Sequence, residues 1–262
     1  MRRKIITVIF ALMVAIPVLC ISFRLLQYVK ADLGLKETAE ITASYVMQVP
    51  ENQDTRINSV NPEDFIDITG LRTENPDVTG YVRVDGTGID YPVMKNEDPD
   101  KYLYAGFDGE YAVYGSIFMD NACYEGAMNT VLYGHNMKSG KMFAPLKNYL
   151  NPEYKEAHPI IKYIDEHAIS LYRICAVFSA PAGDDSLIKC LVPYTEDEME
   201  QLRGYVDAAG GTVYEDFGYG DQLITLATCE YTHKDGRLFV IGKLSDRIGT
   251  GGDHFENTKA EQ

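Results

Sequence analysis

The sequence predicts a mostly-β domain, a closed or nearly closed barrel with a few helices outside it, behind an N-terminal membrane helix. Three observations predict this architecture: an uncharged run of 19 residues near the N-terminus, a series of short strand-like runs separated by turns, and two helical stretches that interrupt them. The chain has 262 residues, of which 45% are hydrophobic, so it can bury a sizeable core. No internal repeat of solenoid or propeller period is visible.

The charge of the chain is unevenly distributed. Lys and Arg number 24 and Asp and Glu number 39, which gives a formal net charge of −15. Residues 1–30 hold five basic residues and no acidic one, so residues 31–262 carry 19 basic and 39 acidic residues, a net charge of −20. This acidic body disfavours a nucleic-acid-binding protein, and the basic head indicates that the two parts occupy different environments.

The uncharged run, Ile5–Phe23, is predicted to be a membrane helix. As a helix it spans about 28 Å, close to the roughly 30 Å of a bilayer's hydrocarbon core. Three basic residues precede it, so the positive-inside rule keeps residues 1–4 in the cytoplasm and puts the body outside. A cleaved signal peptide is the alternative, but the run is long for one and no clear A-x-A site follows. We therefore expect an uncleaved anchor over 5–23 and a polar, partly helical stalk over 24–60.

The body begins with a predicted helix that starts at Asn61-Pro62 and ends near Gly70. Strand-like runs dominate the remainder, with Asp85-Gly86 as a hairpin turn inside the first of them. These runs cover residues 80–94, 114–120, 129–135, 168–180, 222–229 and 237–244.

Two helices are expected between the strands, over 141–150 and over 196–209, the second opening at Thr195. We place the folded domain at residues 61–245. The Gly-rich, polar segment 246–262 is expected to be a mobile tail.

The five cysteines do not form a recognisable metal or dithiol motif. Cys20 lies in the predicted anchor, and no C-x-x-C is present, so neither a zinc ribbon nor a thioredoxin-like site is supported. Cys175 and Cys190 sit in apolar runs and are interpreted as small buried hydrophobes. A disulfide between these two cysteines stays open as an alternative.

Cys229 and Arg237 are the first candidates for chemistry. Cys229 ends an apolar run, and seven residues with a turn signal at Asp235-Gly236 separate it from Arg237, which opens the next run. If the two runs form an antiparallel hairpin, these residues become cross-strand neighbours with backbones about 5 Å apart. The same register pairs 227 with 239 and 225 with 241. A cation beside a thiol favours the nucleophilic thiolate, and a guanidinium can stabilise an oxyanion.

A cysteine nucleophile also needs a proton partner, normally histidine. His135 is the best candidate, because it ends a strand and opens a loop, and Gly134 would let the backbone turn sharply before it. His233 lies in the loop between Cys229 and Arg237, and the other histidines are interpreted as surface residues: His158, His167 and His254. Each candidate alone also fits a structural role, as a core thiol, a structural imidazole or a solvated guanidinium.

Several blocks of the sequence resemble one enzyme family. TLATCEYTHKDGRLFVIGKL, residues 225–244, resembles the sortase signature TLxTC followed by an arginine on the next strand. YGHNMKSGKMFAPLKNY, residues 133–149, is similar to the histidine region of sortases, with the following helix of class B enzymes. The runs 80–94 and 114–120 are similar to early strands of that class. The resemblance covers about residues 60–245, and the blocks agree in order.

The resemblance implies a membrane-anchored cysteine transpeptidase of Gram-positive bacteria, built on an eight-stranded β-barrel with the helix 196–209 between its sixth and seventh strands. By position in the motifs, Cys229 is the nucleophile, with His135 and Arg237 as its partners. Thr228 matches the signature threonine and Ala227 the variable position. The candidate substrate-binding residues are Thr228, Leu226 and Leu103. The chemistry implied needs no metal and no organic cofactor.

The implied reaction is cleavage after the threonine of a C-terminal sorting motif, LPxTG-like or NPxTx-like, on a surface protein. The thioacyl intermediate then passes to an amine of the cell-wall precursor lipid II or to a pilin lysine. Three alternatives stay open: hydrolysis at the same site by a cysteine peptidase, a non-catalytic membrane-tethered domain that binds a peptide or glycan, and a redox sensor. The sensor lacks a resolving cysteine near Cys229 in the sequence.

Overall fold

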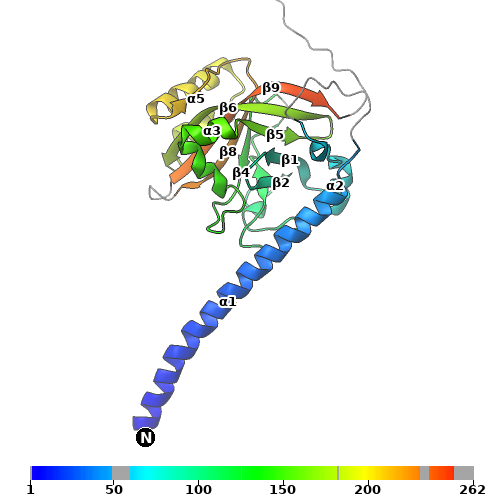
Figure 1. Cartoon of the computed structure of the whole chain (residues 1–262). Coiled ribbons are helices and arrows are strands. Elements are labelled where there is room, and N and C mark those ends of the chain that lie inside the picture. The colour runs from blue at the N-terminus through cyan, green and yellow to red at the C-terminus, as the bar shows by residue number, and fades with distance from the viewer. Residues whose placement is uncertain (1, 49–59, 125, 182, 231–235, 251–262) are drawn as a thin grey trace, which may run out of the picture.

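The computed structural model describes residues 2–48, 60–124, 126–181, 183–230 and 236–250. One long helix, α1 (Arg2–Ser44), leads into a β domain with small helices around it (Figure 1). Eight strands form the barrel: β1 (Val78–Val84), β2 (Ile89–Met94), β3 (Ile117–Met119), β4 (Asn129–Tyr133), β5 (Ile160–Ile164), β6 (Ala168–Pro181), β8 (Leu223–Glu230) and β9 (Gly236–Gly249).

The strands close into a ring in the order β5-β1-β2-β3-β4-β8-β9-β6, because β6 pairs back onto β5. A two-residue strand, β7 (Thr212–Val213), adds to β6 outside the ring. The predicted eight-stranded barrel is therefore confirmed. Two of its pairings, β2–β3 and β4–β8, are parallel, and the second of these positions the candidate site.

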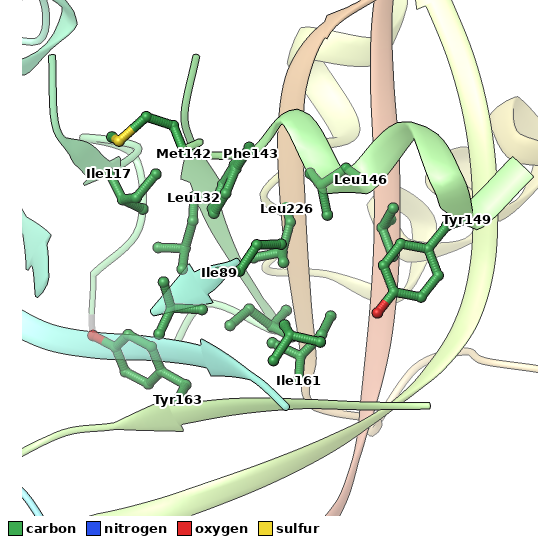
Figure 2. Close-up of a cluster of buried hydrophobic side chains, with 14 of the residues drawn as sticks. Ile89, Ile117, Leu132, Met142, Phe143, Leu146, Tyr149, Ile161, Tyr163 and Leu226 are labelled. Carbon is green, nitrogen blue, oxygen red and sulfur yellow. The ribbon is translucent and has the colours of Figure 1, made fainter. Parts of the chain in front are cut away.

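The barrel interior is filled by large apolar side chains from alternate strand positions. In β1, Val82 and Val84 point into this core, whereas Tyr81 packs in a separate outer cluster with α2 (Ile68–Glu74). Figure 2 shows Leu146 and Tyr149 projecting into the core from η3 (Ala144–Leu150), the short helix that closes over it. Each fully buried side chain of this size contributes roughly 1.5–3 kcal/mol to folding.

Helix α5 (Glu196–Ala208) confirms the second predicted helix. Thr195 caps its N-terminus in a reciprocal arrangement with Glu198, which satisfies backbone N–H groups that have no partner inside the helix. Met199, Leu202 and Val206 share one face and pack on the outside of the sheet, together with the unpredicted helix α4 (Asp185–Cys190).

The first predicted helix of the body is wrong as a single element. It is split into η1 (Pro62–Asp64) and α2, which extends past Gly70 to Glu74. The residues between them pair with the chain that leaves α1: the Met47 N–H donates to the Phe65 carbonyl (2.6 Å), and the Asp67 N–H donates to the Tyr45 carbonyl (2.9 Å). A continuous helix would need these backbone groups for itself. Asp67 then caps α2.

Three other elements differ from the sequence-based expectations. The helix predicted over 141–150 is the 3-10 helix η3, followed by α3 (Pro152–Ala157). Strand β5 was not predicted, because Lys162 interrupts its apolar pattern; this lysine is buried by pairing with Asp64. Strand β9 continues four residues past the predicted domain end, since residues 246–249 pair with the start of β6. Residues 251–262 of the predicted tail lie outside the described residues.

Helix α1 continues well beyond the apolar run, and its C-terminal half lies along the domain (Figure 1). Ala31 and Thr42 are buried there, and the other contact positions recur every three or four residues, so one face of the helix meets the domain. Gly34 lies against the Tyr114 ring, and Asp32 forms an ion pair with Lys141. Within the described residues, one helix, over Met13–Ser44, is long and apolar enough to cross a membrane.

Candidate active site

Strands β8 and β9 form the predicted antiparallel hairpin in the predicted register. Cys229 lies opposite Arg237, residue 227 opposite 239, and residue 225 opposite 241. The connecting residues 231–235, which include His233, lie outside the described residues, as does the side chain of Cys229. The backbone positions alone make Cys229 and Arg237 cross-strand neighbours at one end of the barrel.

Strand β4 brings His135 to the same end, because it runs parallel to β8 with Tyr133 opposite Ala227. Two residues further along the chain lie Cys229, still on β8, and His135, in the loop that follows β4. The two segments are joined by hydrogen bonds: the Gly134 N–H donates to the Ala227 carbonyl (3.1 Å), and the Thr228 hydroxyl donates to the Gly134 carbonyl (2.7 Å). Gly134, directly before His135, is thus hydrogen-bonded to β8, the strand that carries Cys229.

Gly134 serves a purpose different from the predicted one. Its backbone does not adopt the left-handed conformation that favours glycine in sharp turns. Instead, a Cβ atom at this position would overlap the Ile117 side chain and lie 2.8 Å from the Phe143 ring. Glycine is needed here for close packing, which lets β4 lead into the His135 loop across the barrel core.

The imidazole of His135 is half-buried and held in one orientation. Its Nε2 lies 2.7 Å from the carbonyl oxygen of Leu103. Because a carbonyl only accepts hydrogen bonds, Nε2 carries a proton and donates it, which leaves Nδ1 for proton exchange. Leu103 ends η2 (Lys101–Leu103), and Gly115 packs on it with φ of +56°, so close that a Cβ would lie 2.6 Å from the Leu103 oxygen.

A cavity of about 310 Å³ opens at this end of the barrel. It is lined by the candidate residues His135, Arg237, Thr228 and Leu103 together with apolar, polar and acidic neighbours: Phe118, Met119, Pro99, Ala227, Gly134, Tyr133, Asn121, Asp100 and Asp120. Leu226 does not line it, because its side chain is fully buried in the barrel core (Figure 2). The structure therefore gives no support to a substrate contact by Leu226.

The wall of the cavity carries charges of both signs. Tyr133 donates to Asp120 (2.8 Å), and burial together with this carboxylate raises the pKa of the phenol above its ordinary value. The positive charge of Arg237 acts in the opposite direction, because it favours the phenolate and so lowers the pKa of Tyr133. Sequence reasoning did not single out Asp120 and Tyr133, because they are distant in the sequence from Cys229 and Arg237 and only the fold brings them to the same cavity.

The other described thiols of the body are enclosed. Cys123, Cys175 and Cys190 are buried and unpaired, so the alternative of a disulfide between Cys175 and Cys190 is wrong. Burial raises the pKa of Cys175 to about 12 and that of Cys123 to about 11. These groups stay protonated near neutral pH, which makes them poor nucleophiles.

The remaining histidines play no part in this cavity within the described structure. His167 is exposed, as predicted, whereas His158 is half-buried against Gly86 with its Nδ1 2.9 Å from the Asp85 carbonyl. His158 is therefore a support for the first hairpin rather than a surface residue. His254 lies outside the described residues. No group of three metal-ligating side chains suited to hold an ion occurs among the residues that the structure describes.

The family profile of the Sortase domain matches residues 82–245, well over half of the chain. The chain belongs to the sortase family. Sortase B of Listeria monocytogenes is 35% identical to it over 199 residues, which cover 73% of this chain and 79% of the relative. Sortase B of Staphylococcus aureus is 24% identical over 256 residues, which cover 93% of this chain and 98% of the relative.

Solved sortases share its fold. The sortase B of B. anthracis in complex with AAEK1 superposes with a TM-score of 0.63 at 27% identity, over 81% of this chain and 98% of that one. Clostridium perfringens sortase B gives a TM-score of 0.60 at 28% identity, over 68% of this chain and 99% of that one. Sortases are cysteine transpeptidases that act at the cell surface. This chain is thus a sortase of class B, an enzyme and not the non-catalytic binding domain that the sequence left open.

Proposed function

We propose that Cys229, His135 and Arg237 form the catalytic centre of a transpeptidase that cuts a C-terminal sorting motif after threonine and joins the new end to an amine. One observation carries this proposal: the pairing of Cys229 with Arg237 and the parallel run of β4 beside β8 bring all three residues to one end of the barrel. His135 and Arg237 also line one cavity there.

In the first half-reaction the Cys229 thiolate attacks the carbonyl carbon of the threonine. A carbon–sulfur bond forms, and the carbonyl electron pair moves to the oxygen, where the Arg237 guanidinium stabilises the negative charge. Collapse of this intermediate breaks the carbon–nitrogen bond. His135, as imidazolium, gives its proton to the departing amine. We assign that proton to Nδ1, since Nε2 is engaged with the Leu103 carbonyl.

In the second half-reaction an amine attacks the thioester at Cys229. His135 takes the proton that the amine releases, the carbon–sulfur bond breaks, and an amide forms as the thiolate leaves. Water in place of the amine would give a free carboxylate, which is the hydrolytic alternative. The two outcomes share the same residues and differ only in the nucleophile.

The proposed donor is a surface protein with an LPxTG-like or NPxTx-like motif, and the proposed acceptor is an amine of lipid II or a pilin lysine. The apolar wall at Leu103, Phe118 and Met119 suits an apolar side chain of such a motif. A Staphylococcus aureus sortase B–substrate complex, with a TM-score of 0.60 and 26% identity over 72% of this chain and 87% of that one, supports substrate binding by a sortase of this fold. The proposed chemistry uses no metal and no organic cofactor.

We further propose that residues 5–23 anchor the enzyme in the cell membrane, with residues 1–4 in the cytoplasm and the catalytic domain outside. The helix α1 supports an uncleaved anchor, because it continues without a break from the apolar run into the segment that contacts the domain. Residues 24–60 then connect the membrane to the catalytic domain.

The test is a peptide library randomised around a Pro-x-Thr core, incubated with the full-length enzyme in detergent with and without triglycine. We expect cleavage after threonine, and a peptide–triglycine product that grows at the expense of the hydrolysed product as triglycine is added. Product partitioning that never responds to the amine would contradict transpeptidation and favour a peptidase.

A further inference from the structure

A second cavity, of about 270 Å³, lies between α1 and the loop that begins at His135. Arg24, Gln27 and Tyr28 line it on the helix side, and His135 and Lys138 line it on the loop side. We call it the helix-side cavity. The same imidazole therefore borders two spaces, one bounded by α1 and one bounded by β8 and β9. A residue in this position can meet two substrates from two directions.

The charge of the helix-side cavity is opposite to that of the chain. Its lining, as far as the structure describes it, includes the two basic side chains Arg24 and Lys138 and no carboxylate, although the chain has a net charge of −15. In an acidic protein such a pocket concentrates anions that the surrounding surface repels. Arginine also matches carboxylate and phosphate oxygens in a bidentate geometry.

The helix side of this cavity sits next to the proposed membrane anchor. Arg24, Gln27 and Tyr28 have the spacing i, i+3, i+4 and share one helix face, directly after the apolar run that ends at Phe23. Arginine and tyrosine both favour the boundary between membrane and water. With the proposed anchor in place, the cavity opens close to the outer face of the cell membrane.

The loop side is held firmly. The Phe143 N–H donates to the His135 carbonyl (3.0 Å), and Asn136 pairs with Met142 across the loop. Met142 is buried with φ of 57°, a conformation that non-glycine residues rarely adopt, and its N–H donates to the Tyr91 hydroxyl (3.0 Å). An ion pair from Lys141 to Asp32 ties the loop to α1. This ion pair joins the two walls of the cavity.

We propose that the helix-side cavity is the acceptor site, and that it takes a primary amine whose carrier bears an oxyanion, a carboxylate or a phosphate, a short distance from the amine. Arg24 and Lys138 bind the oxyanion, and the amine lies at His135, which removes its proton as it attacks the thioester. This inference rests on the proposed function, because it assigns the second substrate of that reaction.

Matched acceptors test the role of the oxyanion. Triglycine and triglycinamide differ only in the terminal carboxylate, and O-phosphoethanolamine and ethanolamine differ only in the phosphate. Transfer from one donor peptide is measured with the full-length enzyme in detergent. We expect KM to be at least about tenfold lower for the charged member of one pair, as a charge-assisted hydrogen bond provides. The pair that shows the difference identifies carboxylate or phosphate as the natural oxyanion.

Variants on the two walls test the location. Arg24→Gln and Lys138→Gln are each expected to reduce the preference for the charged acceptor to about threefold or less. Lys30→Gln is the matched control, since it removes one cation from the same helix outside the cavity lining, and it should leave the preference intact. Two walls give two independent variants, so a defect in helix docking cannot imitate both results.

Failure of the proposed function and failure of the proposed acceptor site give different results. If the wild-type enzyme does not cut the donor peptide, the proposed function is wrong. If it cuts and transfers, but charged and neutral acceptors have equal KM, the acceptor site is wrong and the proposed function stands. A preference that survives in both Arg24→Gln and Lys138→Gln would likewise overturn the helix-side cavity as its origin.

Discussion

Two groups of ionisable side chains lie in this domain, and they differ in what surrounds them. In the first, Lys162 donates to one carboxylate oxygen of Asp64 (2.6 Å) and Arg83 donates to the other (2.7 Å), and the side chains of Asp64 and Lys162 are 0% and 1% exposed. In the second, His135 and Arg237 are half-buried and border an open cavity. The first group is buried at its centre and ends in the half-exposed carboxylates Asp85 and Asp90, which pair with Lys162 and Arg83, whereas the second borders a cavity.

This difference separates a structural role from a chemical one. The Asp64 group joins η1 to β1 and β5, and its central carboxylate is fully buried between two cations. The His135 group uses backbone contacts, such as the Leu103 carbonyl, to fix geometry while leaving a ring nitrogen for exchange. The thiols divide in the same way, with Cys175 enclosed in the core and Cys229 at the end of a strand beside the cavity-lining Thr228.

Removing one charge from the buried Asp64 group should give the largest change in stability. Lys162→Met leaves Asp64 buried without one of its partners, and we expect a loss of about 3–5 kcal/mol in the free energy of unfolding, measured by urea denaturation. Activity per folded molecule should stay unchanged. Lys147→Met, which removes an exposed lysine, is the control and should change stability by less than about 0.5 kcal/mol. A loss below 1 kcal/mol in Lys162→Met would remove the distinction drawn between the two groups.

Removing a charge from the cavity that His135 and Arg237 border should lower the reaction rate and leave the stability nearly unchanged. Arg237→Ala is expected to raise the barrier to acyl transfer by about 3–4 kcal/mol, a fall of roughly 10²–10³-fold in kcat, with little change in stability. Steady-state kinetics on a cleavable donor peptide measures this effect. The control Arg203→Ala removes an exposed arginine of α5 and should retain full activity. If Arg237→Ala lost stability instead of rate, the arginine would belong with the structural group.

The buried thiols should make a smaller contribution to the free energy of unfolding, and this contribution should depend on pH. Burial raises the folded-state pKa of Cys123 to about 11 and of Cys175 to about 12, above the value near 9 of an exposed thiol. The folded state therefore holds these protons longer than the unfolded chain. Their contribution to stability is complete below about pH 9 and is lost as the pH rises toward 12. Urea titrations from pH 8 to 11 should show this decline, and Cys175→Val should make it shallower, because Cys123 still contributes. A pH-independent free energy would contradict the enclosed state of the thiols.

Local sequence patterns predicted the features that depend on neighbours along the chain. The strand–turn–strand pattern around Asp235-Gly236 predicted the pairing of Cys229 with Arg237, and the structure has that register. The capping pattern at Thr195 likewise predicted where α5 begins. These features need no knowledge of distant segments.

The features that escaped prediction depend on distant partners. Strand β5 contains a buried lysine whose partner, Asp64, is 98 residues away. The break in the helix predicted over 61–70 comes from pairing with the residues that follow α1. The parallel pairing of β4 with β8, which brings His135 to the end of the barrel where Cys229 lies, joins segments about a hundred residues apart and leaves no local signal. The contact of α1 with the domain was missed for the same reason.

The central claim is tested most directly by mapping the intermediate. The full-length enzyme is incubated with a sorting-motif peptide, stopped in acid and digested, and the acylated residue is located by tandem mass spectrometry. We predict a thioester on Cys229 that disappears when triglycine is added and never forms in Cys229→Ala. A peptide that is still cut by Cys229→Ala, or an acyl group carried by any other residue, would contradict the account.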